Sequence, residues 1–439
     1  MKKSLLLFLA AGSMAVTGYA QEIKEKEVAR IISTLAADDM GGRLPGTPGI
    51  EKAATFISGE FEKAGLLPLT GEKNFLQEFG KFRLQQTSVT LTVSGQEKDW
   101  PVIPVGASRS FDWEKDDSYA VVHVKDPGEL MKILRHPELM ERNVLVWLAP
   151  SMAGFLGDLT ASFSERSYDT KAALEAATTK ASDGKHIIMV YEKEPVADTV
   201  SWSIHLRRDI GSQHFANVAG MIKGSGKPDE YVVFSGHYDH LGTLPAVAGD
   251  SIANGADDDA SGTTAVIMLA KYFKKHPPVR SIIFVAFTAE ETGGHGSRYF
   301  SEKQDPDKVV AMFNIEMIGK ESKFGKNSAF ITGFERSDFG PILQRNLKGS
   351  TFSFYPDPYP EQNLFYRSDN ATLARQGVPA HTISTTQIDK DQYYHTVDDE
   401  LSTLDVGNIT DIINAIAISA GTIVNGTDTP TRIEKASLK

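Results

Sequence analysis

The segment Asn254–Gly262 has the sequence NGADDDASG and stands directly before a helical pattern of apolar residues. Val266, Leu269, Ala270 and Phe273 follow at the i, i+3, i+4 and i+7 spacing that predicts a helix. Three consecutive carboxylates repel one another, and the positive end of the helix dipole offsets only part of this repulsion. A bound cation would offset much more of it. The segment therefore predicts a metal site at the start of a helix.

Strands and helices alternate along the chain from Tyr231 onward. Alternation of this kind predicts an α/β fold with a mainly parallel central sheet and helices on both of its faces. The expected strands are Tyr231–Ser235, Ser281–Thr288, Val309–Ile315, Ala329–Gly333, Thr351–Tyr355 and Ala380–Ser384. The expected helices are Thr263–Lys275, Ser297–Lys303, Phe339–Leu347, Asn370–Arg375 and Val406–Val424.

Side chains that can bind metal follow the ends of several of these strands. In an open parallel sheet, ligands bind beyond the carboxyl ends of the strands, so residues that follow different strands can meet there. Together with the acidic segment, they predict a two-metal hydrolase site at one edge of the sheet. The side chains concerned are His237, Asp239, Glu290, Glu291, Glu316 and His395.

The composition limits the kinds of ligand and partner. The chain of 439 residues contains no cysteine, which excludes disulfides and thiolate metal ligands. Any metal must then be held by histidine and carboxylate, a set that suits zinc, cobalt or manganese. The formal net charge of −11 argues against nucleic acid as a partner.

Residues Met1–Ala20 have the pattern of a secretory signal peptide. Lys2 and Lys3 form its charged start, Leu5–Ala11 its apolar run, and Gly18–Ala20 a small-x-small cleavage site. The apolar run is too short to span a bilayer permanently, and the sequence has no comparable run elsewhere. We therefore expect export to the periplasm or the medium, without a membrane span.

The remaining chain is too long for one small core, so two domains are expected. From residue 95 to 214 charge density rises, and strands and helices mix without any cluster of metal-binding side chains. We expect a discontinuous catalytic domain, 21–94 with 215–426, that is interrupted by an inserted α+β module at 95–214 and followed by an irregular tail at 427–439. The alternative is a separate N-terminal domain to which Gln21–Phe82 belongs.

The motifs HYDHLG, NGADDDASG, AEETGGHGS, NIEMIG, SDN and YHT follow one another in this order between His237 and Thr396. This order resembles the secreted di-zinc aminopeptidases, in the metallopeptidase family of bacterial leucyl aminopeptidase and glutamate carboxypeptidase. The resemblance covers about 216–426 and extends to Arg43–Gly49, which is similar to a glycine-rich loop of that family. It implies a zinc-dependent exopeptidase fold of the phosphorylase/hydrolase-like type, peptide substrates, and an insert that is a divergent protease-associated-like domain.

The resemblance also implies how metal is bound. Two zinc ions, about 3.5–4 Å apart, would share a water molecule and polarise the scissile carbonyl. One zinc would be held by His237 and Glu316, the other by Glu291 and His395, and Asp258 would bridge the two. Relatives usually have aspartate where Glu316 stands, so the longer side chain changes the reach of this ligand.

Further implied roles belong to residues close to the metals. Glu290 would be the general base that takes a proton from water and delivers it to the leaving amine. Tyr394 would donate a hydrogen bond to the developing oxyanion, and Asp239 would orient His237. Asp369 is expected to support the site or to cap a helix.

Other polar and aromatic residues near the motifs are given structural roles. We expect His240 to form hydrogen bonds or to lie at the surface, and Arg43 to tie down its loop. Asp257 and Asp259 are expected to cap the helix or to hold loops. The aromatic residues that line a substrate pocket or pack in the core are Phe365, Tyr366 and Tyr393.

These observations predict an exported, metal-dependent aminopeptidase that hydrolyses N-terminal residues from peptides. The first alternative is a carboxypeptidase for acidic dipeptides, which needs an arginine near the metals to hold the substrate carboxylate; Arg298 and Arg367 are the candidates. A glutaminyl cyclase, which resembles this fold and works with one zinc, and a non-catalytic binding relative are the others. The sequence does not define the preferred N-terminal residue, the substrate-binding residues or the oligomeric state.

Overall fold

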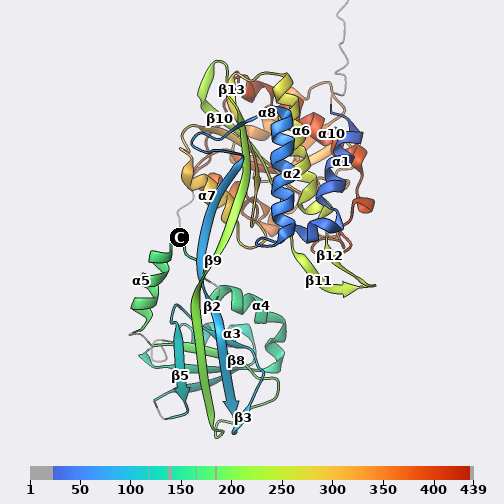
Figure 1. Cartoon of the computed structure of the whole chain (residues 1–439). Coiled ribbons are helices and arrows are strands. Elements are labelled where there is room, and N and C mark those ends of the chain that lie inside the picture. Colours follow the sequence, from blue (N-terminus) through green and yellow to red (C-terminus); the bar gives the residue numbers. More distant parts are fainter. Residues whose placement is uncertain (1–22, 117, 137–140, 165, 183–184, 436–439) are drawn as a thin grey trace, which may run out of the picture. The chain divides into compact units, whose positions relative to one another are not determined.

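The computed structural model describes residues 23–116, 118–136, 141–164, 166–182 and 185–435. The signal segment predicted at Met1–Ala20 lies outside the described residues, so export stays a prediction. The chain divides into two compact units (Figure 1), one with Met1–Gln77 and Ala216–Lys439 and the other with Glu78–Phe215. All predicted site residues belong to the first unit.

The first unit combines N-terminal helices with an alternating α/β region. Its helices are α1 (Glu25–Leu35), α2 (Pro48–Ala64), α6 (Gly262–Lys275), α7 (His295–Lys303), α8 (Phe339–Asn346), α9 (Asn370–Arg375), α10 (Val406–Ser419) and α11 (Gly421–Val424). Its strands are β1 (Leu67–Pro68), β10 (Lys227–His237), β11 (Gly242–Val247), β12 (Asp250–Ala253), β13 (Arg280–Phe287), β14 (Val309–Ile315), β15 (Ser328–Ile331), β16 (Ser353–Pro356) and β17 (Ala380–Ser384). Strands β2 (Leu76–Val93) and β9 (Trp202–Ile222) contain residues of both units.

The central sheet of this unit is mainly parallel. β10 pairs in parallel with both β13 and β14, and β14 pairs in parallel with β17. β9 runs antiparallel to β13, and β15 runs antiparallel to β17. The predicted fold class, α/β with a mainly parallel sheet and helices on both faces, is therefore confirmed.

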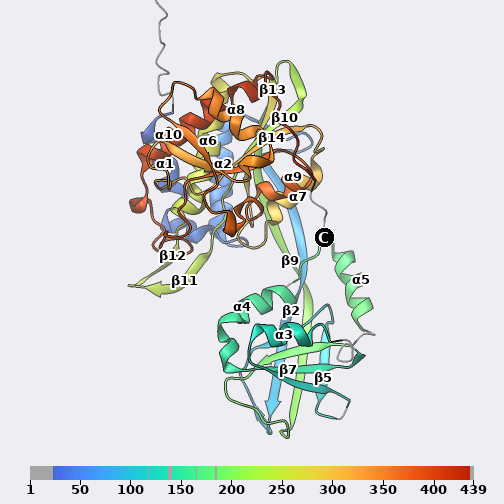
Figure 2. The same ribbon diagram turned by 180° about the vertical axis from the view of Figure 1, so that it is seen from behind.

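Hydrophobic cores cover both faces of the sheet. Because successive side chains of a strand point to opposite faces, Ile282 and Phe284 of β13 join one cluster of buried residues, while Ile283 and Val285 join the other. The first cluster includes residues of α1, α2, α6, α8 and α10, and the second includes residues of α7 and α9. These two groups of helices can be followed in Figure 1 and Figure 2. Packing on both faces fixes the ends of the strands, where the site lies.

The second unit has a sheet of its own. Strands β6 (Ala120–Val124), β7 (Val144–Leu148) and β8 (Ile187–Tyr191) pair in parallel, and β4 (Val102–Pro104) pairs antiparallel with β8. The likeness of this unit to a protease-associated domain stays a prediction. Its other elements are β3 (Gln96–Glu97), β5 (Ser110–Glu114), α3 (Pro127–Ile133), α4 (Leu156–Leu159) and α5 (Lys171–Ser182).

Some elements differ from those that the sequence pattern predicts. Polar and apolar residues alternate at Ser88–Val93, which predicts a short strand, but β2 is one strand that begins at Leu76. The second unit therefore begins earlier than the predicted residue 95. β9 has 21 residues and was not predicted, because its middle at Arg207–His214 is mostly polar and lacks the pattern of a buried strand. The predicted helix Val406–Val424 is interrupted between α10 and α11.

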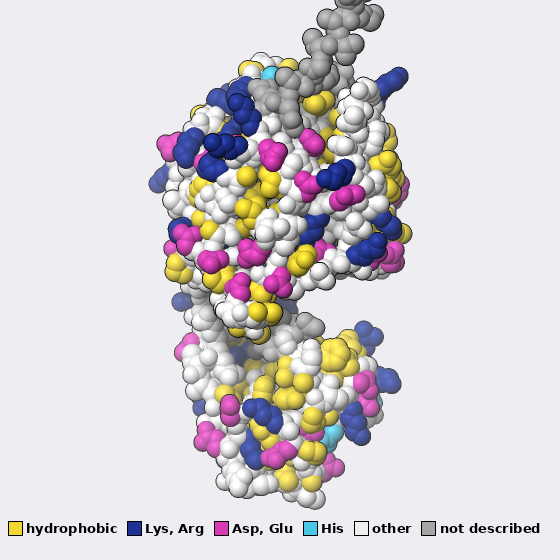
Figure 3. Space-filling view, turned by 90° about the vertical axis from the view of Figure 1, so that its right-hand side faces the viewer, with side chains coloured by type: hydrophobic (Ala, Val, Ile, Leu, Met, Phe, Trp, Pro, Cys, Tyr) yellow, Lys and Arg dark blue, Asp and Glu magenta, His cyan; other side chains and the backbone are white. Residues whose placement is uncertain are grey.

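Within the described residues, no helix combines the length and the apolar character needed to cross a membrane. On the face of the molecule drawn in Figure 3, acidic and basic side chains are interspersed. The described part of the predicted tail has no helix or strand, yet it is anchored: Arg280 donates to the backbone oxygen of Asp428, and Ile433 is buried.

Candidate metal centre

The site residues follow the carboxyl ends of the parallel strands. β10 ends at His237, Glu290 and Glu291 come shortly after β13, and Glu316 is the first residue after β14. The segment after β17 carries His395. Because these strands run in the same direction, their ends bring the residues to one edge of the sheet.

Several predicted ligands lie at contact distance from one another. The Nε2 atom of His237 lies 3.2 Å from Oδ1 of Asp258. At the other oxygen of the same carboxylate, Nε2 of His395 lies 3.3 Å from Oδ2. The same His395 atom lies 3.1 Å from Oε2 of Glu291. Asp258 therefore stands between the two histidines, as a bridging ligand would.

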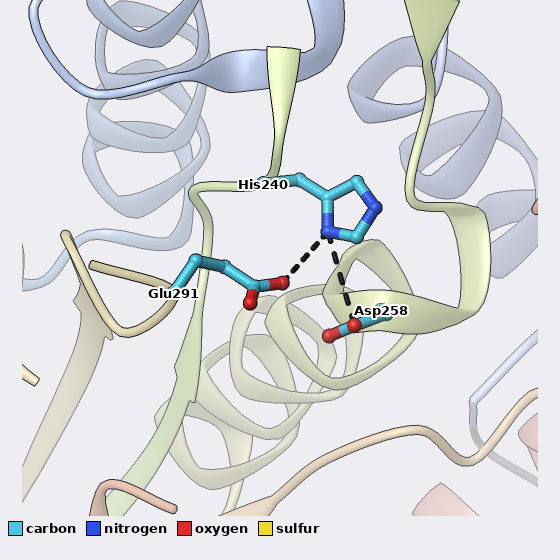
Figure 4. Close-up of side chains that lie close together, drawn as sticks. All are labelled: His240, Asp258 and Glu291. Carbon is cyan, nitrogen blue, oxygen red and sulfur yellow. Dashed lines mark hydrogen bonds and ion pairs between the residues drawn. The ribbon is translucent and has the colours of Figure 1, made fainter. Parts of the chain in front are cut away.

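His240 also belongs to this cluster, a role that the sequence reasoning missed. Its ring is buried, and Nδ1 lies 2.9 Å from Oε1 of Glu291 and 3.8 Å from Oδ2 of Asp258. Figure 4 shows the ring facing both carboxylates. One ligand atom from each of the three residues lies within 4.8 Å of the other two, as in a group that could hold a metal ion. The sequence signal that could have identified His240 as a site residue is its position in the motif HYDHLG, which begins at His237.

Glu316 lies in the same cavity as Asp258. Its Oε2 atom is buried and has no hydrogen-bond partner among the described residues. Burial raises the pKa of Glu316 to about 7; His237 opposes the rise, and the carboxylates of Asp258 and Asp369 add to it. A divalent cation would supply the positive charge that this carboxylate lacks.

The charges within the cluster depend on one another. Burial would raise the pKa of Asp258, but the adjacent imidazoles of His237 and His395 hold that pKa well below its usual value. Burial would lower the pKa of His395, but Asp258 and Glu291 raise it to about 10. A metal ligand must be unprotonated, so metal binding at this site would release protons.

The donor set fits zinc, which binds imidazole and carboxylate. Two ligand atoms at about 2.0–2.1 Å from a tetrahedral zinc are separated by about 3.3 Å. The contacts that join His237, Asp258, His395 and Glu291 measure 3.1–3.3 Å. In addition, Nε2 of His237 and Oδ2 of Asp258 are buried without hydrogen-bond partners among the described residues. Buried polar atoms need a partner, and a metal ion would provide one.

Asp239 makes contacts other than the predicted one. Its Oδ1 lies 3.8 Å from Nδ1 of His237, and that nitrogen lies 3.2 Å from the backbone oxygen of Asp239 instead. The carboxylate accepts hydrogen bonds from the backbone N–H groups of Glu290 at 3.1 Å and Glu291 at 3.4 Å. Two backbone amides thus bind the Asp239 carboxylate, which fixes the backbone of Glu290 and Glu291. The imidazole of His237 is oriented by the backbone oxygen of Asp239.

The two aspartates that flank Asp258 hold loops, one of their expected roles. The carboxylate of Asp259 accepts hydrogen bonds from the backbone N–H groups of His237 and Met317, each at 3.1 Å. Asp257 accepts one from the N–H group of Gly319 at 2.7 Å. The acidic segment is therefore tied to the end of β10 and to the segment after β14.

The acidic segment forms a wide turn, Ala256–Ser261, and α6 begins after it at Gly262. A Cβ atom on Gly262 would lie 2.0 Å from the backbone oxygen of Ile315, the last residue of β14. Glycine therefore permits the close approach that brings Asp258 beside the residues that follow β14.

Arg43 connects the glycine-rich loop to the site, as expected. Its side chain is fully buried and donates to the backbone oxygens of Tyr238 at 2.8 Å and Gly255 at 2.9 Å. It also donates to the backbone oxygen of Asn254. One guanidinium therefore holds both the segment that follows β10 and the segment that carries Asp258.

Left-handed backbone conformations occur directly beside the site residues. Ala289, which precedes Glu290, has φ 57°, and Met317, which follows Glu316, has φ 50°. His395 itself has φ 59°. Each such conformation costs about 1–3 kcal/mol in a residue with a Cβ atom, and it persists where the surrounding structure imposes it. Strain of this kind is common at functional sites.

Glu290 and Tyr394 line the same cavity as Glu316. Burial raises the pKa of Glu290 well above its usual value; the carboxylate of Glu316 adds to the rise, while His237 opposes it. A raised pKa suits a group that takes up and releases a proton near neutral pH. The ring of Tyr394 stacks on that of His395, with ring centroids 3.8 Å apart.

Asp369 stands at the start of α9 without capping that helix, and its support of the site stays a prediction. Its side chain makes no capping hydrogen bond at the start of α9, so the predicted cap is not observed. The residue is buried, and burial together with the charge of Glu291 raises the pKa of Asp369 to about 6.

The cavity beside the cluster has a volume of about 90 Å³. Its apolar lining includes Phe330, Leu364 and Ile388. Two of the aromatic residues named from the sequence belong instead to a hydrophobic core, where Phe365 is buried and Tyr366 packs against the cluster.

One of the two arginines considered for carboxylate binding reaches the cavity. Arg367 lines it together with Glu290 and Glu316, and among the described lining residues it is the sole cation. Arg298 lines a different cavity, on the surface of α7.

Comparison with known proteins gives a match to a family model and a shared fold. Residues 217–419 match Peptidase family M28. A probable zinc metalloprotease of Pyrenophora teres f. teres (strain 0-1) is 35% identical over 130 residues, which cover 28% of this chain and 28% of that protein. A second, from Leptosphaeria maculans, is 31% identical over 144 residues, which cover 32% of this chain and 31% of that protein. The chain thus spans about a third or less of the length of these curated relatives.

Solved structures resemble nearly the whole chain. The aminopeptidase from Aneurinibacillus sp. strain AM-1 has 16% identity and a TM-score of 0.55, and the match covers 95% of this chain and 97% of that one. The zinc aminopeptidase from Bacillus subtilis has 16% identity and a TM-score of 0.56, with 93% and 97% covered. At this identity the likeness shows a shared fold.

Proposed function

Because residues 217–419 match Peptidase family M28, we propose that the protein is an exported, zinc-dependent aminopeptidase that hydrolyses N-terminal residues from peptides. The observation that carries the proposal is the convergence of His237, Asp258, Glu291 and His395, whose ligand-type atoms are linked by contacts of 3.1–3.3 Å. The shared fold with two aminopeptidases supports it.

The proposed metal content is two zinc ions per chain. His237 and Glu316 would hold one ion, Glu291 and His395 the other, and Asp258 both. When bound, zinc lowers the pKa of water and polarises a carbonyl group. Cobalt and manganese suit the same ligand types.

The side chains around the cavity would move the proton and stabilise charge. The Glu290 carboxylate takes a proton from the water whose oxygen attacks the scissile carbonyl carbon, and it then delivers this proton to the leaving amine nitrogen. The Tyr394 hydroxyl donates a hydrogen bond to the tetrahedral oxyanion. The Asp239 carboxylate keeps Glu290 in place because it accepts a hydrogen bond from the backbone N–H group of Glu290.

The proposal is tested on purified protein, by measuring metal content and the hydrolysis of a panel of aminoacyl p-nitroanilides with and without chelator. We expect about two zinc ions per chain and hydrolysis that is lost with the chelator and restored by zinc. N-acetylated substrates serve as the matched control, since an aminopeptidase requires a free amine. Hydrolysis that persists without metal, or that ignores acetylation, would contradict the proposal. Release of ammonia from peptides with N-terminal glutamine would indicate a glutaminyl cyclase instead.

Export is tested separately by sequencing the mature N-terminus of protein recovered outside the cytoplasm. The predicted cleavage site places Gln21 first. An uncleaved N-terminus at Met1 would contradict this part of the proposal.

A further inference from the structure

The guanidinium of Arg367 has no partner among the described residues. Its side chain is exposed, and the guanidinium forms no hydrogen bond or ion pair with the described residues. Arginines that stabilise this fold behave differently: Arg43 and Arg280 are buried and donate to several backbone oxygens. The positive charge of Arg367 is therefore free to act on something that enters the cavity.

Thr386 is a second unused donor in the same cavity. The residue is 6% exposed, and its Oγ1 atom is buried without a hydrogen-bond partner among the described residues. Neighbouring hydroxyl groups that line the cavity are engaged, since Ser384 donates to the backbone oxygen of Met317 and Thr382 donates to Asn370. Because a buried hydroxyl without a partner is costly, its lack of one indicates a place for a ligand atom.

The backbone that carries Arg367 is fixed even though the side chain is free. Ser368 accepts a hydrogen bond from Nδ2 of Asn314 at 2.7 Å. Asn370 donates to the backbone oxygens of Phe365 at 3.0 Å and Ala380 at 3.2 Å. The guanidinium is thus presented to the cavity from a rigid base, as a binding residue requires.

The chemistry of the cavity indicates an anionic partner for Arg367. Asp258, Glu290, Glu291 and Glu316 also line it, yet among the described residues none of these carboxylates pairs with the guanidinium. A planar guanidinium binds a carboxylate through two parallel N–H donors. The Thr386 hydroxyl can donate a hydrogen bond to the same carboxylate. The small cavity, about 90 Å³, suits a short segment of substrate.

We propose that Arg367 and Thr386 form a subsite for a carboxylate of the substrate, so that the enzyme prefers peptides with a carboxylate next to the scissile bond. This inference rests on the proposed peptidase function. The carboxylate has two sources, the C-terminus of a dipeptide or the acidic side chain of the N-terminal residue, and both present the same chemistry to the guanidinium.

The test compares the zinc-loaded full-length protein with its Arg367→Gln variant on four substrates. Leu-Gly carries a C-terminal carboxylate and Leu-glycinamide lacks it. Glu-p-nitroanilide carries a side-chain carboxylate and Leu-p-nitroanilide lacks it. Arg298→Gln is the matched control, because it removes the same charge from a different cavity.

For Arg367→Gln we expect KM to rise about 10–100-fold for a carboxylate-bearing substrate, as for the loss of a hydrogen-bonded charge. The kcat for that substrate, and the KM for the matched neutral substrate, should stay as in the wild type. Arg367→Lys should recover part of the loss, because it keeps the charge without the fork of donors. Thr386→Val should raise KM for the same substrate. An effect confined to Leu-Gly assigns the subsite to the C-terminus, and one confined to Glu-p-nitroanilide assigns it to the N-terminal side chain.

Equal KM values for wild type and Arg367→Gln on all substrates would overturn the inference, as would equal losses on carboxylate-bearing and neutral substrates. Such results leave the peptidase function intact, because the wild-type protein still cleaves. Failure of the peptidase function has a different signature, since wild-type protein loaded with zinc would then cleave none of the substrates. Thermal melting of Arg367→Gln confirms that the variant is folded, which its exposed side chain leads us to expect.

Discussion

At the scale of single residues, the proposed reaction depends most directly on Glu290. Replacing it by glutamine keeps the size of the side chain but removes its ability to accept a proton. We expect Glu290→Gln to retain the bound metal and to lose about 10²–10⁴-fold in kcat, measured with an aminoacyl p-nitroanilide beside a metal analysis. A variant that keeps wild-type kcat would exclude Glu290 as the base. Loss of metal together with activity would instead show that Glu290 helps to hold the ions.

His381 gives a prediction about pH and stability. The ring is fully buried, its Nδ1 lies 2.8 Å from the backbone oxygen of Thr332, and burial lowers the pKa of His381 from 6.5 to about 4. The unfolded chain therefore binds a proton at higher pH than the folded chain does. Stability is unaffected by this group above about pH 6.5 and falls as the pH decreases toward 4, by about 3 kcal/mol in total.

The prediction is checked by denaturant unfolding between pH 4 and pH 7. The variant His381→Gln should show a weaker decline of stability over this range, although packing losses lower its stability at neutral pH. His136→Gln, which changes an exposed histidine, serves as the control. Identical pH profiles for wild type and His381→Gln would contradict the assignment.

Sequence patterns identify residue types at a site better than they identify contacts. The order of the motifs, through its resemblance to a known family, named His237, Asp258, Glu291 and His395, and the structure brings these residues together. It did not reveal that the Asp239 carboxylate binds backbone amides, because such hydrogen bonds depend on where the chain turns after β13. The unpaired state of a side chain, as in Arg367, is likewise a property of the folded molecule.

At the scale of elements, strands buried on both faces were predictable and exposed strands were not. β13 and β14 are continuous apolar runs, as expected for the centre of a parallel sheet, and their ends lie close to the predicted ones. β9 escapes prediction because half-exposed polar residues interrupt its apolar pattern. The site could be located at the sheet edge because most of its residues follow predictable strands, while Asp258 precedes the predictable helix α6.

Lys320 links two of the segments that follow these strands. Its Nζ atom lies 2.7 Å from Oδ2 of Asp391 and 3.5 Å from Oδ2 of Asp257, and the ammonium stands 5.1 Å from the centroid of the Tyr393 ring. Asp391 and Tyr393 belong to the segment that carries His395. The lysine thus fixes the loop with the last ligand against the acidic segment.

Replacing Lys320 by methionine should leave the buried carboxylate of Asp257 without its cation and loosen both segments. We expect metal affinity to fall about 10–100-fold, as for other residues that position ligands, measured by competition with a chromophoric chelator. Lys320→Arg should retain most of the affinity. The control Lys326→Met removes an exposed lysine paired with Asp405 and should bind metal as the wild type does. Unchanged affinity in Lys320→Met would exclude the proposed coupling.

At the scale of the whole molecule, all candidate ligands belong to the unit with Ala216–Lys439. The division into two units could be anticipated from the change of sequence character, but the exact boundary could not, because β2 continues through it without a break in its strand pattern. The candidate site contains no described residue of the unit Glu78–Phe215. The likeness of this unit to a protease-associated domain stays a prediction.

Bound metal should also stabilise the folded state and raise its Tm. Folding brings Asp258, Glu290, Glu291 and Glu316 to one cavity, where they repel one another unless a cation is bound. A ligand that binds only the folded state adds about 2.7 kcal/mol at a free concentration 100-fold above its dissociation constant, which corresponds to about 4–5 °C in Tm for a unit of this size. We therefore expect chelation to lower the Tm by this amount, and added zinc to restore it. His237→Ala, which lacks a proposed ligand, should melt at nearly the same temperature with and without chelator. If chelation removes stoichiometric metal from the wild-type protein without changing its Tm, the ions do not bind at the buried carboxylates, and the centre described here is not their site.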